Sequence, residues 1–391
     1  MEKNDHPSIE LSVVMPCLNE ADTLSTCISK AQSAFADCAC TGEVIVADNG
    51  SDDGCPEIAE AAGARVIHVP ERGYGSALMA GIAEARGRFV IMGDADDSYD
   101  FLEIPKFVAE LRAGSDLVQG CRLPSGGGRV LPGAMPFLHR WLGNPMLSGL
   151  ARTMFKLPVS DIYCGMRGFT RSLYDELDQR CTGMEFATEM IIRSAQRGAR
   201  IDEVPITLHP DGRQTHGPHL RTFRDGWRTL RFFLLYSPRW LFLIPGLLLL
   251  GLGALGYALA LPGVHLLGAQ LGAHTLLVAS LALLMGFQFL LFAVVSKAVA
   301  EGMGLLPEDP RMKRFFRVAT LERGLLLGGV ALLAGLGLIG GAALDWQRQA
   351  FGDLEYASTL RRVVPGVTLA ALGIQAILSS FFVSMLGMSR R

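Results

Sequence analysis

The sequence has no excess of charge of either sign. Its 391 residues include 36 Lys and Arg against 38 Asp and Glu, which gives a net charge of −2. Nucleic-acid-binding domains normally present a basic surface, so this balance argues against nucleic acid as a partner. Zinc-finger spacing is also missing, because Cys38 and Cys40 have no second Cys or His pair to complete a site. We expect the eight cysteines to be reduced thiols of a cytosolic domain.

We expect no leader segment at the start of the sequence either. The first ten residues are polar and contain no basic-then-apolar run, which predicts that the N-terminal part stays in the cytoplasm. Hydrophobic residues make up 50% of the chain, which is high for a soluble enzyme. The excess lies after residue 236, whereas residues 1–235 mix charged and apolar side chains as a soluble domain does. The length and this contrast predict two units.

Four apolar stretches mark the second half, at about residues 238–261, 273–299, 324–344 and 364–388. Each supplies the roughly twenty residues that a helix needs to cross a bilayer, and charge is nearly absent inside them. Their glycines permit close packing, which suits a homo-oligomer or product flipping and proves neither.

The loops between these stretches predict an orientation. Lys and Arg are missing from the first loop and gather at residues 300–323 and at the C-terminus, so the positive-inside rule places the 300–323 loop and both termini in the cytoplasm. Residues 219–236 combine an apolar stripe with a basic stripe, the pattern of an amphipathic helix in the headgroup region. We therefore divide the chain into a cytosolic domain (1–218), an interfacial helix (219–236) and an all-α four-span transmembrane domain (237–391). The architecture suggests the bacterial inner (plasma) membrane.

In the first half, short apolar runs alternate with helical segments. Strands are expected at residues 11–15, 43–48, 65–69, 88–92 and 116–121, with helices at 20–35, 57–62, 75–86 and 104–112. This alternation predicts an α/β, Rossmann-like fold with a parallel sheet and helices on both faces. Ligands of such sheets bind beyond the carboxyl ends of the strands, so the polar residues there are the candidate site.

Asp94 and Asp96 follow a buried strand directly. Carboxylate oxygens are ligands for Mg²⁺ or Mn²⁺, and such an ion would neutralise a diphosphate leaving group. A lone Asp-x-Asp is also common in capped surface turns. Here, however, Asp48 and Asp52 end another strand, where they can accept hydrogen bonds from a nucleobase and a ribose.

Together the segments VVMPCLNE, VADNGSDDG, RGYGSALMAGIAEARG and GDADDS resemble the successive donor-site motifs of family 2 glycosyltransferases. Within that family the chain resembles the polyprenyl-phosphate branch, the dolichyl-phosphate mannose and glucose synthases, over about residues 10–240. The resemblance implies a GT-A fold, an inverting reaction and a divalent metal at Asp94 and Asp96. It also implies nucleotide-sugar contacts at Pro16, Asn19, Glu20, Asp48 and Asp52, while Gly73 and Gly75 allow close approach to the ligand.

Three later segments resemble further motifs of the same family, and Arg167, Glu185 and Glu189 in them are the catalytic candidates beside Asp96. In DIYCGMRGF, Met166 replaces an aromatic residue or Leu, and Arg167 is expected to pair with phosphate oxygens. GMEFATE resembles the acceptor-side helix, with Glu185 and Glu189 on one face. A catalytic or acceptor role for these two stays open beside a solvated face or an ion pair with Arg193.

The third segment, RQTHGPHLR, occupies the place where the family binds the lipid phosphate. Its candidates for that contact are Arg213, His219 and Arg221. Positive charge beside a membrane span would explain Arg221 almost as well, but it explains Arg213 poorly because that residue lies further from the span.

The chemistry then needs no general base, since a phosphate monoester loses its second proton at about pH 6 and arrives as an oxyanion. The resemblance favours inverting transfer of a hexose from UDP-glucose, with GDP-mannose next, to a polyprenyl phosphate at the cytoplasmic membrane face. One alternative is a different acceptor, namely a glycolipid, a protein or a polysaccharide. The other is a non-enzymatic nucleotide-binding membrane protein, against which the four intact aspartates argue.

Overall fold

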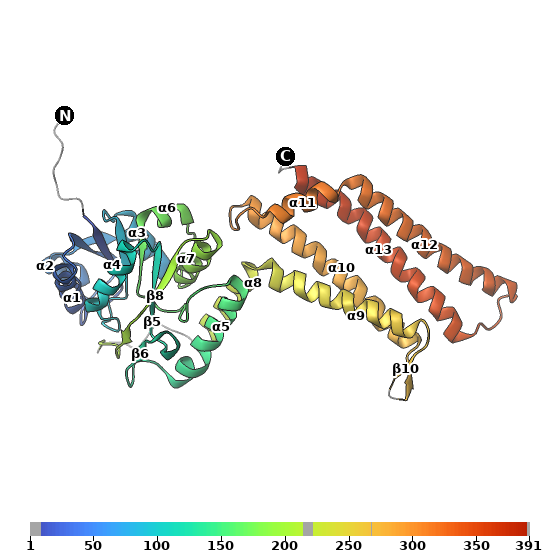
Figure 1. Ribbon diagram of the computed structural model, residues 1–391, viewed down its shortest axis with the longest axis horizontal. Coiled ribbons are helices and arrows are strands. Elements are labelled where there is room, and N and C mark those ends of the chain that lie inside the picture. The colour runs from blue at the N-terminus through green and yellow to red at the C-terminus, as the bar shows by residue number, and fades with distance from the viewer. Residues whose placement is uncertain (1–8, 214–221, 267, 389–391) are drawn as a thin grey trace. The chain divides into compact units, whose positions relative to one another are not determined.

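The computed structural model describes residues 9–213, 222–266 and 268–388, and the chain divides into two compact units, Met1–Phe233 and Leu234–Arg391. The first unit contains a large sheet with helices around it, and the second consists mainly of long helices (Figure 1). The predicted fold class, an α/β domain followed by four transmembrane helices, is confirmed.

Within the described residues, the main sheet has seven strands in the order β3-β2-β1-β4-β7-β5-β8. The strands are β1 (Leu11–Cys17), β2 (Gly42–Asp48), β3 (Arg65–His68), β4 (Phe89–Met92), β5 (Leu117–Cys121), β7 (Arg167–Thr170) and β8 (Ile201–Pro205). The first four pair in parallel, and so do β5 and β8.

β7 differs, because it runs antiparallel to both β4 and β5. The five strands predicted from the sequence all run in one direction, and β7 is an additional strand that was not predicted. Its four residues, RGFT, show neither apolar alternation nor a β-branched run, so the sequence carries no strand signal there.

Helices cover both faces of the sheet, as the alternation predicts. On one face, α1 (Leu24–Asp37) and α4 (Ile104–Arg112) pack with alternate residues of β1 and β4 in a single apolar core. On the other face lies α3 (Tyr74–Ala83), where a methyl carbon placed on Gly81 would lie 2.6 Å from Val14. The edge helix α2 (Cys55–Ala61) follows the β2 loop.

The rest of the first unit is less regular. The short strands β6 (Arg129–Val130) and β9 (Thr207–Leu208) pair with each other. The single-turn helices η1 (Phe101–Glu103) and η2 (Pro124–Gly126) lie in loops, and a π-helical turn, η3 (His139–Gly143), leads into α5 (Asn144–Phe155). The unit ends with α6 (Arg171–Leu177), α7 (Glu185–Gln196) and most of α8 (Thr222–Leu235).

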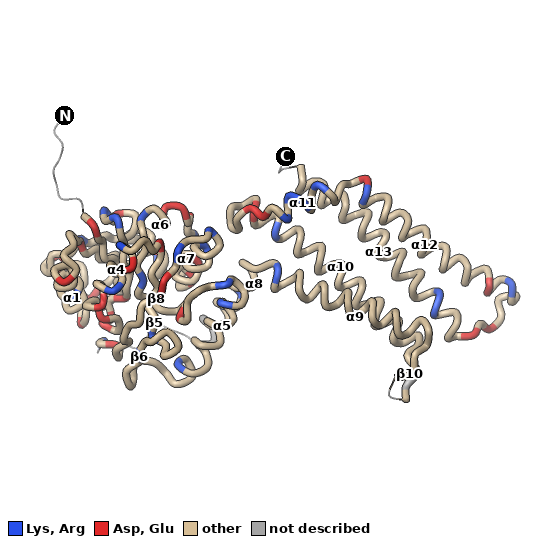
Figure 2. Tube along the Cα trace, in the orientation of Figure 1, with Lys and Arg blue, Asp and Glu red and all other residues tan. Residues whose placement is uncertain are grey.

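The second unit contains, in its described part, four helices that are long and apolar enough to cross a membrane. They are the segment Arg239–Ala260 (the π-turn η4, Arg239–Leu243, and α9, Ile244–Ala260), α10 (Ala273–Gly302), α12 (Leu321–Arg348) and α13 (Tyr356–Met388). A short basic helix, α11 (Pro310–Val318), and a small hairpin of β10 (His265–Leu266) and β11 (Ala269–Gln270) lie in the connections. Figure 2 shows how few charged residues the long helices carry between their ends.

Glycines bring α12 and α13 into close contact. A methyl carbon on Gly335 would lie 2.5 Å from the carbonyl oxygen of Gly366, and one on Gly373 would lie 2.7 Å from that of Gly328. Such contacts replace a hydrophobic driving force, which helices in lipid lack. A second contact joins three helices through hydroxyls: Tyr257 on α9 lies 2.7 Å from Ser280 on α10 and 3.0 Å from Thr368 on α13.

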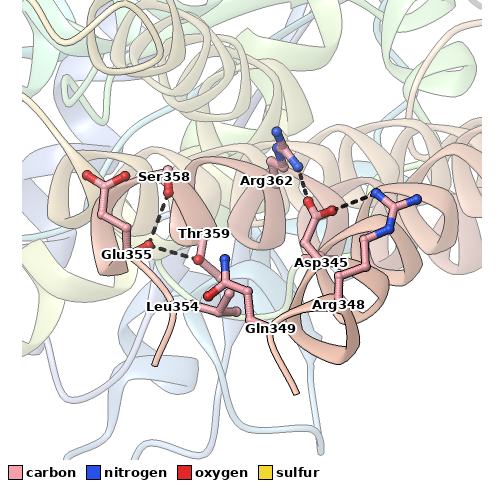
Figure 3. Close-up of a pocket in the computed structure, with 9 residues that line it drawn as sticks. Asp345, Arg348, Gln349, Leu354, Glu355, Ser358, Thr359 and Arg362 are labelled. Atoms are coloured by element: carbon pink, nitrogen blue, oxygen red, sulfur yellow. Dashed lines mark hydrogen bonds and ion pairs between the residues drawn. The ribbon is translucent and has the colours of Figure 1, made fainter. Parts of the chain in front are cut away.

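A polar cavity of about 360 Å³ opens where α12 ends and α13 begins (Figure 3). Asp345 at its wall accepts hydrogen bonds from Arg348, at 3.3 Å, and Arg362, at 2.5 Å. None of the nine residues that line the cavity is a predicted donor-site or acceptor-site residue.

The glycine contact makes a prediction about stability. Gly335→Val should lower the thermal unfolding temperature of the detergent-purified chain, because the added side chain forces the two backbones apart at a cost of about 1–3 kcal/mol. Gly340→Val is the matched control on α12, since nothing lies within 4 Å of an added methyl carbon there. Equal unfolding temperatures for the two variants would show that the close approach of α12 and α13 does not stabilise the unit.

Candidate active site

The loops that follow β1 and β2 are fastened to each other by side chains of the candidate site. Asn19, in a left-handed backbone conformation with φ of 60°, accepts the Asp52 N–H at 2.9 Å, and its own N–H donates to Ser51 at 3.0 Å. Asp48 closes the β2 turn by accepting the N–H groups of Gly50 and Ser51, at 3.3 and 3.1 Å. Pro16 lies at the end of β1 beside Ala47 of β2. The structure thus brings Pro16, Asn19, Asp48 and Asp52 together, as predicted.

Asn49 is a residue of this region that the sequence analysis did not single out. Its amide nitrogen donates to the carbonyls of Val69 and Glu71, at 3.2 and 2.8 Å, and its amide oxygen accepts the Gly73 N–H at 2.7 Å. It therefore connects the β2 loop to residues 73–75 at the start of α3, which we call the glycine turn. Its position directly after Asp48 was the only signal available.

Asp94 and Asp96 lie just beyond β4. Tyr74 donates its hydroxyl to Asp94 at 2.9 Å, and Ser98 donates both its N–H and its hydroxyl to Asp96, at 3.0 and 2.6 Å. Burial and the charge of Asp96 raise the pKa of Asp94 to about 7, against the lowering effect of the Tyr74 hydrogen bond. The charge of Asp96 thus disfavours ionisation of Asp94, and a bound cation would relieve this repulsion.

Arg213 supplies a positive charge at this place. Its Nε donates to Glu20 at 2.7 Å and its Nη2 to Asp96 at 2.8 Å, and its Nη1 lies 3.2 Å from Asp211. The guanidinium group is largely buried, with 10% of the side chain exposed. Arg213 was predicted for the acceptor phosphate, and it lies against the donor-side carboxylates. The other two phosphate candidates, His219 and Arg221, fall outside the described residues.

The chain's own ligands for a divalent ion are few. Among the described residues there is no group of three or more His, Cys, Asp and Glu side chains that could hold a metal. Asp94 and Asp96 offer two carboxylates, and Asp96 already holds a cationic group. This set fits Mg²⁺ or Mn²⁺ with the remaining positions filled by phosphate oxygens and water, the usual arrangement for Mg²⁺ in phosphate-binding sites.

Gly73 and Gly75 do permit a close approach, and in this structure the approach is to the chain itself. A methyl carbon on Gly73 would lie 2.3 Å from the Thr182 carbonyl oxygen, and one on Gly75 would lie 2.3 Å from that of Cys181. The glycine turn thus packs directly on the segment that precedes α7.

Arg167 and Glu189 are fully buried, with 0% of each residue exposed. Arg167 donates to the backbone carbonyls of Ala187 and Cys164, and its Nε has no hydrogen-bond partner among the described residues. Burial lowers its pKa. Glu189 pairs with Arg193 at 3.1 Å, the ion pair that the sequence analysis left open. In this arrangement neither side chain reaches solvent.

Glu185, by contrast, begins α7 and keeps 21% of its side chain exposed, with Arg228 of α8 at 3.7 Å. It is the carboxylate of this helix that a ligand can approach.

A buried ion pair supports the turn beside Asp94. Arg122 forms a bidentate salt bridge with Asp161, with N–O distances of 2.7 and 3.0 Å, and both side chains are at least nine-tenths buried. Tyr99 accepts the Gly165 N–H at 2.8 Å, and a methyl carbon on Gly165 would lie 3.0 Å from Asp94. Asp161 opened a recognised motif, whereas Arg122 gave no signal because its partner lies 39 residues away.

Two family models match the chain. Residues 12–178 match Glycosyl transferase family 2, and residues 294–387 match the Glycosyltransferase family 2 C-terminal transmembrane region. Together with the four apolar helices, the second match shows that the chain is an integral membrane protein.

Curated relatives extend these matches. The low-salt glycan biosynthesis hexosyltransferase Agl6 of Haloferax volcanii is 40% identical over 378 residues, which is 96% of this chain and 89% of the relative. A dolichyl-phosphate hexose transferase of the same organism is 35% identical over 198 residues, 50% of this chain and 82% of the relative. Among solved structures, glucosyl-3-phosphoglycerate synthase from Mycobacterium tuberculosis, in complex with Mn²⁺ and UDP, is 22% identical with a TM-score of 0.44. That match covers 58% of this chain and 78% of the other.

The Arg122–Asp161 pair makes a prediction about stability. Asp161→Asn should lower the free energy of unfolding by about 3–5 kcal/mol, since it leaves a buried guanidinium group without its counter-charge. Asp175→Asn is the control, because Asp175 pairs with Arg171 at the surface with 60% of its side chain exposed, and such pairs contribute about 1 kcal/mol or less. Thermal unfolding of both variants in detergent measures the difference, and similar small losses would contradict the buried pair's role.

Proposed function

The chain belongs to glycosyltransferase family 2, and on that basis we propose that it transfers a hexose from a nucleoside-diphosphate sugar to a polyprenyl phosphate at the cytoplasmic face of a membrane. The names of two relatives support the transferred group and the acceptor: one is a hexosyltransferase, and the other is a dolichyl-phosphate hexose transferase. The observation that carries the proposal is the pair Asp94 and Asp96, with a cationic side chain on Asp96, beyond a strand of a membrane-anchored α/β unit.

The donor side of the proposal uses the fastened loops after β1 and β2. Pro16, Asn19, Glu20, Asp48 and Asp52 are proposed to contact the nucleotide. The hydrogen bonds between these loops hold them in place before the ligand arrives, which lowers the entropy cost of binding. UDP-glucose is the favoured donor and GDP-mannose the next.

The metal of the proposal is Mg²⁺ or Mn²⁺, held by Asp94 and Asp96. When bound, the ion neutralises charge on the departing diphosphate. The chain's own side chains orient the two carboxylates, because Tyr74 holds Asp94 and Ser98 holds Asp96.

The acceptor side centres on Arg213, with His219 and Arg221 as further candidates. The acceptor oxyanion needs alignment and no general base, so its phosphate must compete with Glu20 and Asp96 for the guanidinium group. Glu185 is proposed to help to position the acceptor, because its side chain is partly exposed. Arg167 and Glu189 would act from the interior through the backbone that they bind.

An exposed apolar surface that runs from Phe137 over η3 to the start of α5 supports a lipid acceptor. Phe137, Trp141 and Met146 are 79%, 58% and 58% exposed, and the Arg140 guanidinium carbon lies 5.3 Å from the Trp141 ring centre. Exposed aromatic and apolar residues with a basic rim are typical of a surface that enters the headgroup region. At its other end, α5 packs Phe155 on Phe233 of α8, with ring centres 5.8 Å apart.

Orientation is part of the same proposal. α8 ends at Leu235, only four residues before the first membrane-spanning segment begins at Arg239, so the end of α8 lies near the membrane surface. The basic helix α11 connects α10 to α12, and the positive-inside rule places that connection in the cytoplasm. We infer a plasma-membrane protein with its catalytic unit on the cytoplasmic side.

The reaction is tested by transfer of labelled sugar from UDP-glucose, GDP-mannose and UDP-N-acetylglucosamine to polyprenyl phosphate in membranes containing the full chain. We expect a labelled lipid from one donor. Chelation of divalent ions should abolish it, and Asp96→Ala should reduce it by about 100-fold or more. Asp175→Ala, at an exposed position, should leave the rate unchanged.

Other outcomes separate the alternatives. Donor hydrolysis without a lipid product would reject the polyprenyl-phosphate acceptor and favour a glycolipid, protein or polysaccharide. A folded chain that neither binds nor consumes any of the donors would favour a non-enzymatic role.

The surface of η3 and α5 is tested by fluorescence quenching in nanodiscs that contain brominated lipid. The Trp141 signal, taken as wild type minus Trp141→Phe, should be quenched because the ring enters the boundary between the headgroups and the lipid chains. Adding Glu60→Trp to the Trp141→Phe chain gives a control tryptophan on α2, which should not be quenched. Quenching of neither tryptophan would show that this surface stays in water.

A further inference from the structure

A buried carboxylate fixes the backbone that precedes α7. Glu189 accepts the N–H groups of Arg180 and Cys181 through one oxygen, at 3.0 and 2.9 Å, and its other oxygen lies 3.1 Å from Arg193. Glu189 and Arg193 are both 0% exposed. A carboxylate held in this way defines the path of the chain at residues 180–182, because each N–H group has a charged acceptor in the protein interior.

The backbone that Glu189 holds is in turn the surface on which the glycine turn is seated. Thr182 accepts the Ser76 N–H at 3.1 Å, and the carbonyls of Cys181 and Thr182 occupy the space where Gly75 and Gly73 would otherwise carry side chains. Gly73 has a φ of 150°, a conformation that glycine tolerates best.

Tyr74 stands between those two glycines, and its side chain leads to the donor site. Its hydroxyl donates to Asp94 at 2.9 Å. On the other side of the turn, Asn49 accepts the Gly73 N–H at 2.7 Å, so the backbone that carries Tyr74 is held from two directions. The hydroxyl thus has a defined position relative to the end of β4.

We propose that Tyr74 and Glu189 are positioning residues for donor binding. Glu189 holds the 180–182 backbone, that backbone seats the glycine turn, and the Tyr74 hydroxyl fixes the Asp94 carboxylate in the orientation that receives a nucleoside diphosphate carrying a divalent cation. This inference rests on the proposed function. In it, Glu189 acts on the backbone of residues 180–182 and does not contact the substrate.

The hydrogen bond from Tyr74 matters because an aspartate carboxylate without a partner rotates freely. The terminal torsion of an aspartate is broad, so without a partner Asp94 would sample many orientations. Hydrogen bonds from outer residues to metal-binding groups typically contribute about 10–100-fold to metal affinity or activity. Tyr74 makes such a bond to Asp94, and Ser98 makes the equivalent bond to Asp96.

The first test measures binding of UDP and of GDP to the detergent-purified full chain, with Mn²⁺ and with EDTA. Tyr74→Phe keeps the ring and removes only the hydroxyl. We expect Mn²⁺-dependent binding to weaken by about 10-fold or more, while binding in EDTA and the unfolding temperature stay unchanged. Tyr174→Phe is the matched control, since the Tyr174 ring stacks on Phe169 and is not hydrogen-bonded to Asp94.

The second test is a double-mutant cycle, because Glu189→Gln also weakens a buried ion pair and lowers stability. If Glu189 acts through Tyr74, Glu189→Gln should weaken Mn²⁺-dependent binding in the wild-type background and have little further effect in the Tyr74→Phe background. A merely structural role would weaken binding with Mn²⁺ and with EDTA alike, and by the same factor in both backgrounds.

The outcomes are distinct. Wild-type affinity in Tyr74→Phe would overturn the role of Tyr74, and additive effects would overturn the link to Glu189 while leaving the proposed function standing. A folded wild-type chain that binds neither nucleotide with Mn²⁺ would overturn the proposed function and this inference with it.

Discussion

Crowded negative charge at one edge of the sheet is the constraint on which the donor site depends. Glu20 and Asp96 are buried there and Asp94 is partly buried, and the charge of Asp96 contributes to the raised pKa of Asp94. Such a group is stable only with positive charge nearby. In this structure Arg213 supplies it, although it lies 193 residues along the chain from Glu20 and 117 from Asp96. The Gly212 N–H also donates to the Asp96 carbonyl, at 3.0 Å, so the backbone next to Arg213 is fixed at the site.

The membrane unit differs from the first unit in that its long helices carry few charged groups. Its long helices avoid ionised groups, because lipid cannot solvate them, and they associate through close glycine contacts and a few hydroxyl hydrogen bonds. The exposed apolar side chains along these helices suit a lipid environment. The two units therefore depend on different physics: paired charges around a site in the first, and close backbone packing in the second.

Sequence patterns predicted the features that have a fixed period or length. The four spans follow from apolar length, and the strands before Asp48 and Asp94 follow from short β-branched runs that end in polar turns. Four features escaped, each for a physical reason. β7 is too short and too polar to give a strand signal. The roles of Asn49 and Tyr74 depend on hydrogen bonds to backbone and side chains about 20 residues away. The packing of Gly73 on Thr182 joins segments that are more than a hundred residues apart. The functions assigned to the individual site residues stay predictions that the binding and transfer experiments address.

The three hydroxyls in the membrane unit have a mechanical consequence. Glycines bring α12 and α13 close together, and α9 and α10 approach closely at Gly253 and Gly286, so the four helices form two closely packed pairs. Tyr257 and Ser280 of the α9–α10 pair and Thr368 of the α12–α13 pair lie at the contact between the two pairs. Sliding one helix pair past the other would break these hydrogen bonds and leave hydroxyl groups without partners, because lipid cannot replace them. The three hydroxyl hydrogen bonds therefore oppose relative sliding of the two helix pairs within the membrane.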